Sequence, residues 1–195
     1  MISTSHTHAS PVVLARTSNK VLKMIGITVL AMAAMAITAN HAWAADNLAS
    51  QDKTFLTKAA GAGNAEVSAS QLALQKSSDP EVKSFAQQMI DDHTKVGDDL
   101  KKLATAKGFS APADPSTVDK AKIMGMSKLD GHGFDKQYVA AIGVSAHKDA
   151  VALFKKASTS AKDPDVRQFA ATNLPTLQHH LEMAKELKTS VDAKK

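Results

Sequence analysis

The chain has 195 residues, a length that suits one ordinary domain, and its formal net charge is +5. It contains no cysteine, which excludes a disulfide framework, a thiol nucleophile and thiolate metal ligands. Aromatic residues make up 4% of the chain and no basic stripe carries interleaved aromatics, so nucleic acid is not an expected partner.

Residues 1–44 have the composition of a secretory signal peptide. They contain no Asp or Glu, and three basic residues stand just before an apolar run at 24–39. The small residues Ala42 and Ala44 then match the positions that precede a signal-peptidase cut. We therefore predict that the signal peptide is removed after Ala44 and that the domain at 45–195 is periplasmic or otherwise exported.

A retained membrane anchor is the alternative for the same segment. The apolar run at 24–39 is shorter than the roughly 20 residues that a membrane-spanning helix needs, which favours cleavage. Cleavage removes three of the 24 basic residues and no acidic residue, leaving 21 basic against 19 acidic side chains. The charge of the mature domain is then about +2, so much of the basic character belongs to the signal.

Four long segments of the mature chain show apolar residues in steps of three and four, which predicts helices. The segments span 47–77, 80–107, 134–160 and 164–191. An Asp-Pro step begins the second and the fourth, where Asp caps the helix and Pro suits its first position. The first and second segments, and likewise the third and fourth, are joined by links so short that the two helices of each pair must be antiparallel. The link at 108–133 is long enough to run the length of a bundle and to hold a short helix near 118–129.

The two halves of the mature chain also repeat. The sequence DPEVKSFA at 79–86 recurs as DPDVRQFA at 163–170. A helical hairpin, a long crossover and a similar hairpin are typical of ferritin-like bundles. We therefore predict an all-α fold, a ferritin-like four-helix bundle of two antiparallel helical hairpins joined by a long crossover.

Each predicted helix places one polar, ligand-capable side chain on its apolar stripe. These residues are Glu66, His93, His147 and His180. Glu66 and His93 each lie 13 residues from the turn between their helices, and His147 and His180 each lie 16 residues from theirs. At a rise of about 1.5 Å per residue, both pairs fall near the middle of a bundle whose turns lie at opposite ends. If both turns lie at the same end of the bundle, the heights of the two pairs differ by about one helical turn.

Three imidazoles and a carboxylate in a core suit one transition metal ion, namely Zn, Cu, Fe, Ni or Mn. A bound cation would also compensate the buried carboxylate. The alternative is a hydrogen-bonded polar cluster without a metal. Asp92, next to His93, is assigned to the solvated flank, with a supporting contact to the site as the alternative.

Four fragments of the mature chain resemble one known family. They are FLxxAAxxGxxEV from Phe55, VKxFAxxMIxDH from Val82, FDxxY from Phe134 and LPxLxxHL from Leu174. They resemble the ferritin-like "domain of unknown function" family of exported bacterial proteins over about 55–187. The resemblance implies a ferritin-like bundle and export to the cell envelope, and it implies no established activity.

The chain departs from the di-iron ferritin pattern, which needs Glu-x-x-His on two helices. Ile90 and Leu177 stand three residues before His93 and His180. The first hypothesis is therefore an exported protein with a mononuclear site of Glu66 and the three histidines, used for metal handling or stress defence. The second is a non-enzymatic envelope bundle whose outer surface binds an envelope partner or a membrane. A redox enzyme is the third, and no motif separates it from simple metal storage.

Overall fold

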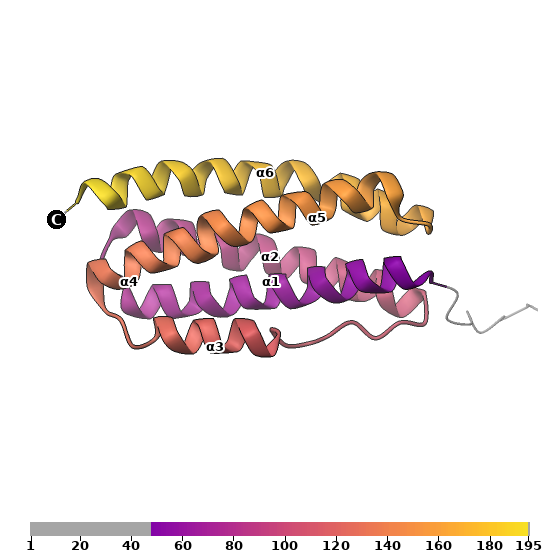
Figure 1. Cartoon of the computed structure of the whole chain (residues 1–195), viewed down its shortest axis with the longest axis horizontal. Coiled ribbons are helices and arrows are strands. Elements are labelled where there is room, and N and C mark those ends of the chain that lie inside the picture. The colour runs from indigo at the N-terminus through magenta and orange to yellow at the C-terminus, as the bar shows by residue number, and fades with distance from the viewer. Residues whose placement is uncertain (1–47, 195) are drawn as a thin grey trace, which may run out of the picture. The chain divides into compact units, whose positions relative to one another are not determined.

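The computed structural model describes residues 48–194, which fold as an all-α bundle (Figure 1). The elements are α1 (Ser50–Lys76), α2 (Pro80–Ala106), α3 (Thr117–Met126), α4 (Gly131–Tyr138), the π-helical segment η1 (Val139–Ala146), α5 (His147–Ser160) and α6 (Pro164–Ala193). Within this part of the chain, no helix is both long enough and apolar enough to span a bilayer. The predicted signal peptide at 1–44 lies outside the described residues.

Matching caps begin the second helix of each hairpin. The side chain of Asp79 accepts a hydrogen bond from the backbone N–H of Glu81 at 2.9 Å. The side chain of Asp163 accepts from the backbone N–H groups of Asp165 and Val166 at 2.8 and 3.2 Å. A proline follows each Asp at the first helical position, where its missing N–H leaves no helical bond unmade. The repeated sequence therefore encodes the same turn twice.

The two turns lie at opposite ends of the bundle (Figure 1). Asp52, in the first turn of α1, is 1% exposed and accepts hydrogen bonds from the backbone N–H groups of Lys162 and Asp163. Lys107, at the end of α2, forms an ion pair with Asp163 at 2.8 Å. The start of α1 and the end of α2 thus meet the second turn, so the first turn lies at the far end. The arrangement of two antiparallel hairpins and a long crossover is as predicted.

The third long helix of the bundle is continuous but not uniform. It begins with α4, passes through η1 and continues as α5, and the sequence predicted one α-helix from 134 to 160. A π-helix has a wider turn, closed by bonds to the fifth residue along the chain, and such segments are frequent at functional sites. The π-helical stretch ends directly before His147, so it sets the direction in which that side chain points.

The core consists of two apolar clusters with a polar layer between them. The first holds Phe55, Leu100, Phe154 and Leu177, among others, and includes a ring contact of 5.1 Å between Phe55 and Phe154. The second holds residues nearer the first turn, including Phe85, Met89, Tyr138, Ala184 and Leu187. On α1, on α2, on α6 and on the long helix formed by α4, η1 and α5, a buried Glu or His lies between the stretch that joins one cluster and the stretch that joins the other.

Candidate metal centre

Three histidines from three helices meet in this polar layer. His93 comes from α2, His147 begins α5 and His180 comes from α6, and all three are buried. Their ring centroids lie 5.3 to 5.5 Å apart. One nitrogen of each ring lies within 4.8 Å of the corresponding nitrogen of the other two, as in a set of ligands around one ion.

His93 has its two ring nitrogens in different surroundings. Nδ1 lies 3.0 Å from Oε2 of Glu66, an oxygen that in a carboxylate can only accept a hydrogen bond. Nδ1 therefore carries a proton, and in the neutral ring Nε2 carries the lone pair. That Nε2 lies 3.3 Å from Nε2 of His147.

His147 is held by the π-helical segment that precedes it. Its Nδ1 donates a hydrogen bond of 3.0 Å to the carbonyl oxygen of Ile142, five residues earlier. A carbonyl oxygen only accepts, so the lone pair of the neutral His147 ring is on Nε2. Two nitrogen lone pairs thus face each other at 3.3 Å when both rings are neutral, and only a proton or another cation between them relieves the repulsion.

His180 supplies the third nitrogen. Its Nε2 donates to Oδ2 of Asp92 at 2.9 Å, which leaves the lone pair of the neutral ring on Nδ1. Nδ1 is buried and has no hydrogen-bond partner among the described residues. Buried polar atoms are nearly always paired, so this nitrogen points to a partner that the protein itself does not supply.

The separation of the nitrogens fits a bound metal ion. Two imidazole nitrogens that bind one Zn²⁺ at about 2.0–2.1 Å in a tetrahedral arrangement lie about 3.3–3.4 Å apart. The observed distance between the Nε2 atoms of His93 and His147 is 3.3 Å. Ligating histidines also commonly donate their other N–H to a carboxylate or a carbonyl, as all three do here.

Glu66 lies on the other side of the imidazole rings. Its Oε2 contacts Nδ1 of His93, and its Oε1 lies 3.7 Å from Nδ1 of His147. Because Nδ1 and Nε2 point away from each other across an imidazole ring, the carboxylate is not beside the Nε2 lone pairs. The structure therefore brings all four predicted residues together, with Glu66 behind two of the rings.

Burial and charge shift the pKa values of the cluster in opposite directions. Burial raises the pKa of Glu66, but the hydrogen bond from His93 and the charges of the three core histidines together lower it more, and the net shift is downward. For His93 burial lowers the pKa, and the charge of Glu66 with the same hydrogen bond outweighs that effect, so the pKa is raised. Burial lowers the pKa of His147 and, despite the hydrogen bond to Asp92, lowers that of His180 to about 4. Of the three imidazoles, His93 is therefore the one that the metal-free cluster protonates most readily.

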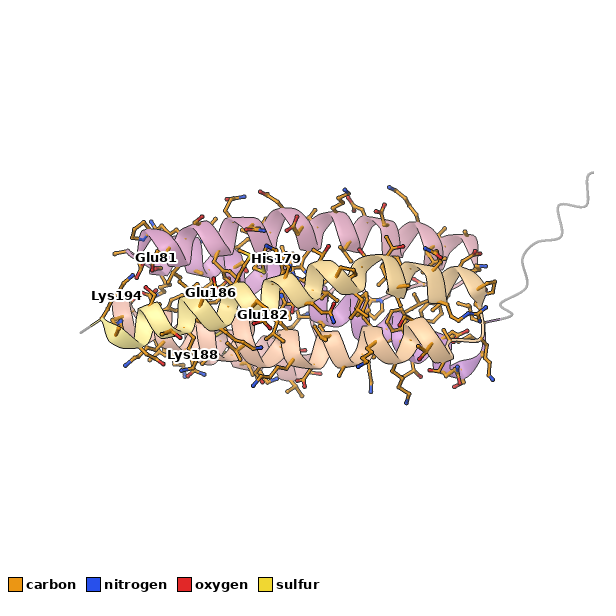
Figure 2. All side chains as sticks on the ribbon, turned by 90° about the horizontal axis from the view of Figure 1, so that it is seen from above. Glu81, His179, Glu182, Glu186, Lys188 and Lys194 are labelled. Atoms are coloured by element: carbon orange, nitrogen blue, oxygen red, sulfur yellow. The ribbon has the colours of Figure 1, made fainter. Side chains whose placement is uncertain are left out.

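Two contacts that orient the histidines, from Asp92 and from the carbonyl of Ile142, are not part of the predicted set of four site residues. Asp92 was assigned to the solvated flank, and its side chain is 39% exposed while it also accepts the hydrogen bond from His180. Its position next to His93 was the only signal for this contact. The carbonyl of Ile142 carries no signal in a sequence, because every residue has one. His179 lies on the exposed face of α6 with Glu182 and Glu186, away from the cluster (Figure 2).

Comparisons with known proteins agree with the bundle and name no activity. A family model described as "Domain of unknown function (DUF4142)" matches residues 38–187. A solved structure described as a DUF305 fragment from Deinococcus radiodurans is similar in fold, with a TM-score of 0.65 and 14% sequence identity. The match covers 73% of this chain and 98% of that chain, and at this identity it shows the fold alone. A search of curated proteins finds no match.

Proposed function

The chain belongs to the DUF4142 family, whose domain has no known function. From the geometry of the three core histidines we propose that it binds one transition metal ion in its core. The ligands are Nε2 of His93, Nε2 of His147 and Nδ1 of His180. One observation carries the proposal: the Nε2 atoms of His93 and His147 lie 3.3 Å apart, a separation that needs a proton or a metal ion between them, and the buried Nδ1 of His180 lacks a partner among the described residues.

The sequence predicts that Glu66 is a metal ligand. In this proposal Glu66 instead orients the ligands and does not bind the metal itself. Its contact with Nδ1 of His93 fixes the tautomer that leaves Nε2 available. Asp92 and the carbonyl of Ile142 do the same for His180 and His147. The negative charge of Glu66 also offsets part of the charge of the ion, which matters in a buried layer between two apolar clusters.

The donor set narrows the choice of ion. Three neutral imidazoles suit Zn, Cu, Fe and Ni, whereas Mn prefers carboxylates, carbonyls and water. Three protein ligands leave at least one coordination position for water or a small molecule. Combined with the predicted export, the proposal describes a metal-handling or stress-defence protein of the cell envelope.

The first test measures metal content and affinity in the full chain, prepared without a histidine tag. We expect about one metal ion per chain, and alanine in place of His93, His147 or His180 lowers the affinity by more than about 100-fold, because each removes a ligand. Glu66→Gln keeps an acceptor for His93 but loses the charge, so it lowers the affinity by about 10- to 100-fold.

His179→Ala is the matched control, because it removes an exposed histidine from the same helix as His180. It leaves both the metal content and the affinity unchanged. Circular dichroism confirms that each variant remains helical. If the three core variants bind metal as the wild type does, or if the wild type binds none, the cluster is a structural one and the proposal is wrong.

A further inference from the structure

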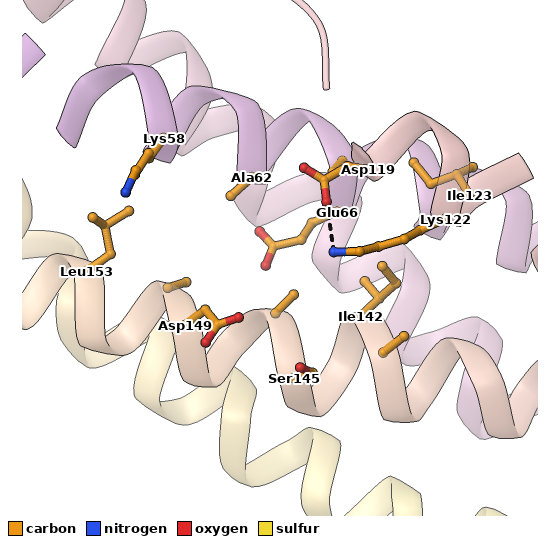
Figure 3. Close-up of a pocket in the computed structure, with 14 residues that line it drawn as sticks. Lys58, Ala62, Glu66, Asp119, Lys122, Ile123, Ile142, Ser145, Asp149 and Leu153 are labelled. Atoms are coloured by element: carbon orange, nitrogen blue, oxygen red, sulfur yellow. Dashed lines mark hydrogen bonds and ion pairs between the residues drawn. The ribbon is translucent and has the colours of Figure 1, made fainter. Parts of the chain in front are cut away.

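A separate cavity opens between α1 and the helix formed by η1 and α5, with α3 along one edge (Figure 3). Its volume is about 430 Å³, which lies within the range of roughly 300–1,000 Å³ that is usual for small-molecule sites. Apolar side chains line it, among them Ala62, Ile142 and Leu153. None of the three core histidines lines this cavity, and its volume far exceeds what a bare metal ion occupies.

Glu66 supplies the polar group at the base of this cavity. Its carboxylate points into the space between α1 and the facing helix (Figure 3). The residue is 2% exposed, Oε2 is taken by His93, and Oε1 is buried without a hydrogen-bond partner in the described part of the chain. A residue that lines the cavity therefore carries a strong acceptor that lacks a donor, and a ligand with one donor group would satisfy it.

The charges around the cavity favour a neutral ligand. Oε2 of Glu66 is already bonded to Nδ1 of His93 at 3.0 Å, so the unpaired oxygen needs one hydrogen-bond donor and not a second charge. The remaining charged residues that line the cavity are two lysines and two aspartates, Lys58, Lys122, Asp119 and Asp149. Lys122 and Asp119 pair with each other at 3.2 Å, and the four charges together sum to zero.

We propose that this cavity binds a small neutral molecule with an apolar body and a hydroxyl group, such as a phenol or a small alcohol. The hydroxyl donates to Oε1 of Glu66, and the body packs against Ala62, Ile142 and Leu153. This site is distinct from the space between the histidine lone pairs, and its occupation does not require a metal. It shares two residues with the surroundings of the metal centre, namely Ile142, whose carbonyl accepts from His147, and Glu66, at the oxygen that His93 does not use.

The test titrates phenol into the full chain without added metal and follows backbone amide shifts by NMR. Anisole is the matched probe, because it has nearly the same body and no hydroxyl donor. We expect saturable shifts in residues around the cavity with phenol, and at least about tenfold weaker binding of anisole, because a hydrogen bond to a carboxylate is lost. Ala62→Leu fills the cavity and abolishes phenol binding.

Ala152→Leu makes the same change at an exposed position of α5 that does not line the cavity, and it leaves phenol binding intact. Three outcomes each overturn the proposal: no saturable shift with phenol, equal affinity for anisole, or undiminished binding in the Ala62→Leu variant. Because no metal is present, failure here is independent of the metal-content test, and either site can exist without the other.

Discussion

Each of the three core histidines has one ring nitrogen bonded to an acceptor and one nitrogen aimed at the other rings. The acceptors differ, since they are the carboxylates of Glu66 and Asp92 and the carbonyl of Ile142. Their effect is the same, because an acceptor fixes the proton on one nitrogen and leaves the lone pair on the other. Residue chemistry therefore determines the direction of three lone pairs, and these converge.

The pKa shifts predict how metal affinity changes with pH. His147 and His180 stay neutral near pH 7 because burial lowers their pKa values, whereas the pKa of His93 is raised because Glu66 outweighs burial. Below the pKa of His93 one proton must leave before the metal binds, so log affinity rises by about one unit per pH unit and levels off above that pKa. A competition titration between about pH 5 and 8 measures the slope.

A slope of two or three would contradict this pattern of pKa shifts, because it would mean that two or three imidazoles are protonated in the metal-free cluster. The His93→Ala variant gives the control. Its residual metal affinity is weak and nearly independent of pH above about pH 6.5, since burial holds the pKa values of the remaining His147 and His180 below the ordinary value of a histidine.

At the scale of elements, the π-helical segment η1 packs unusually closely on α6. A Cβ added at Gly143 would lie 3.1 Å from Cβ of Ala184 and 3.6 Å from Cε1 of Phe85. The first of these atoms is fixed to the backbone and cannot rotate away. The glycine thus permits the approach that brings His147, four residues later, within reach of His180.

We predict that Gly143→Ala lowers the free energy of unfolding by about 1–3 kcal/mol, because the added methyl group overpacks the contact with α6. Gly63→Ala is the matched control, since a Cβ there meets nothing within 4 Å. That change raises the stability by about 0.5–1 kcal/mol through helix propensity alone. Urea denaturation of both variants measures the difference, and equal stabilisation by the two substitutions would show that the close approach imposes no constraint.

At the scale of the whole molecule, the polar layer connects the two hairpins. His93 belongs to the first hairpin, whereas His147 and His180 belong to the second. An ion held by all three therefore binds the assembled bundle and neither hairpin alone. A ligand that binds only the folded state, as this ion would, stabilises that state by mass action.

We accordingly expect a saturating metal ion to raise the melting temperature of the full chain. At a free concentration about 100 times the Kd the gain is about 2.7 kcal/mol, which corresponds to roughly 5–10 °C for a domain of this size. Differential scanning calorimetry with and without a chelator measures it. The His180→Ala variant shows no such rise, and an equal rise in that variant would place the bound metal elsewhere.

The sequence alone determined the four long helices, their matching Asp-Pro turns and the height of Glu66, His93, His147 and His180 along them. These follow from local rules, because helical periodicity and a fixed rise per residue decide which face a residue occupies and how far it lies from a turn. The all-α bundle of two antiparallel hairpins is confirmed on the described residues. The signal peptide, the export and the bound metal stay predictions.

Four features came from the packing of the helices against each other: the nitrogen of each histidine that turns inward, the place of Glu66 behind two rings, the π-helical form of η1 before His147, and a separate cavity that Glu66 lines. None of these follows from periodicity. A side-chain rotamer and its hydrogen-bond partner depend on atoms that come from other helices, such as Asp92 of α2 for His180 of α6. The position of a residue on its helix is a local property, whereas the direction of its lone pair is set by its neighbours across the core.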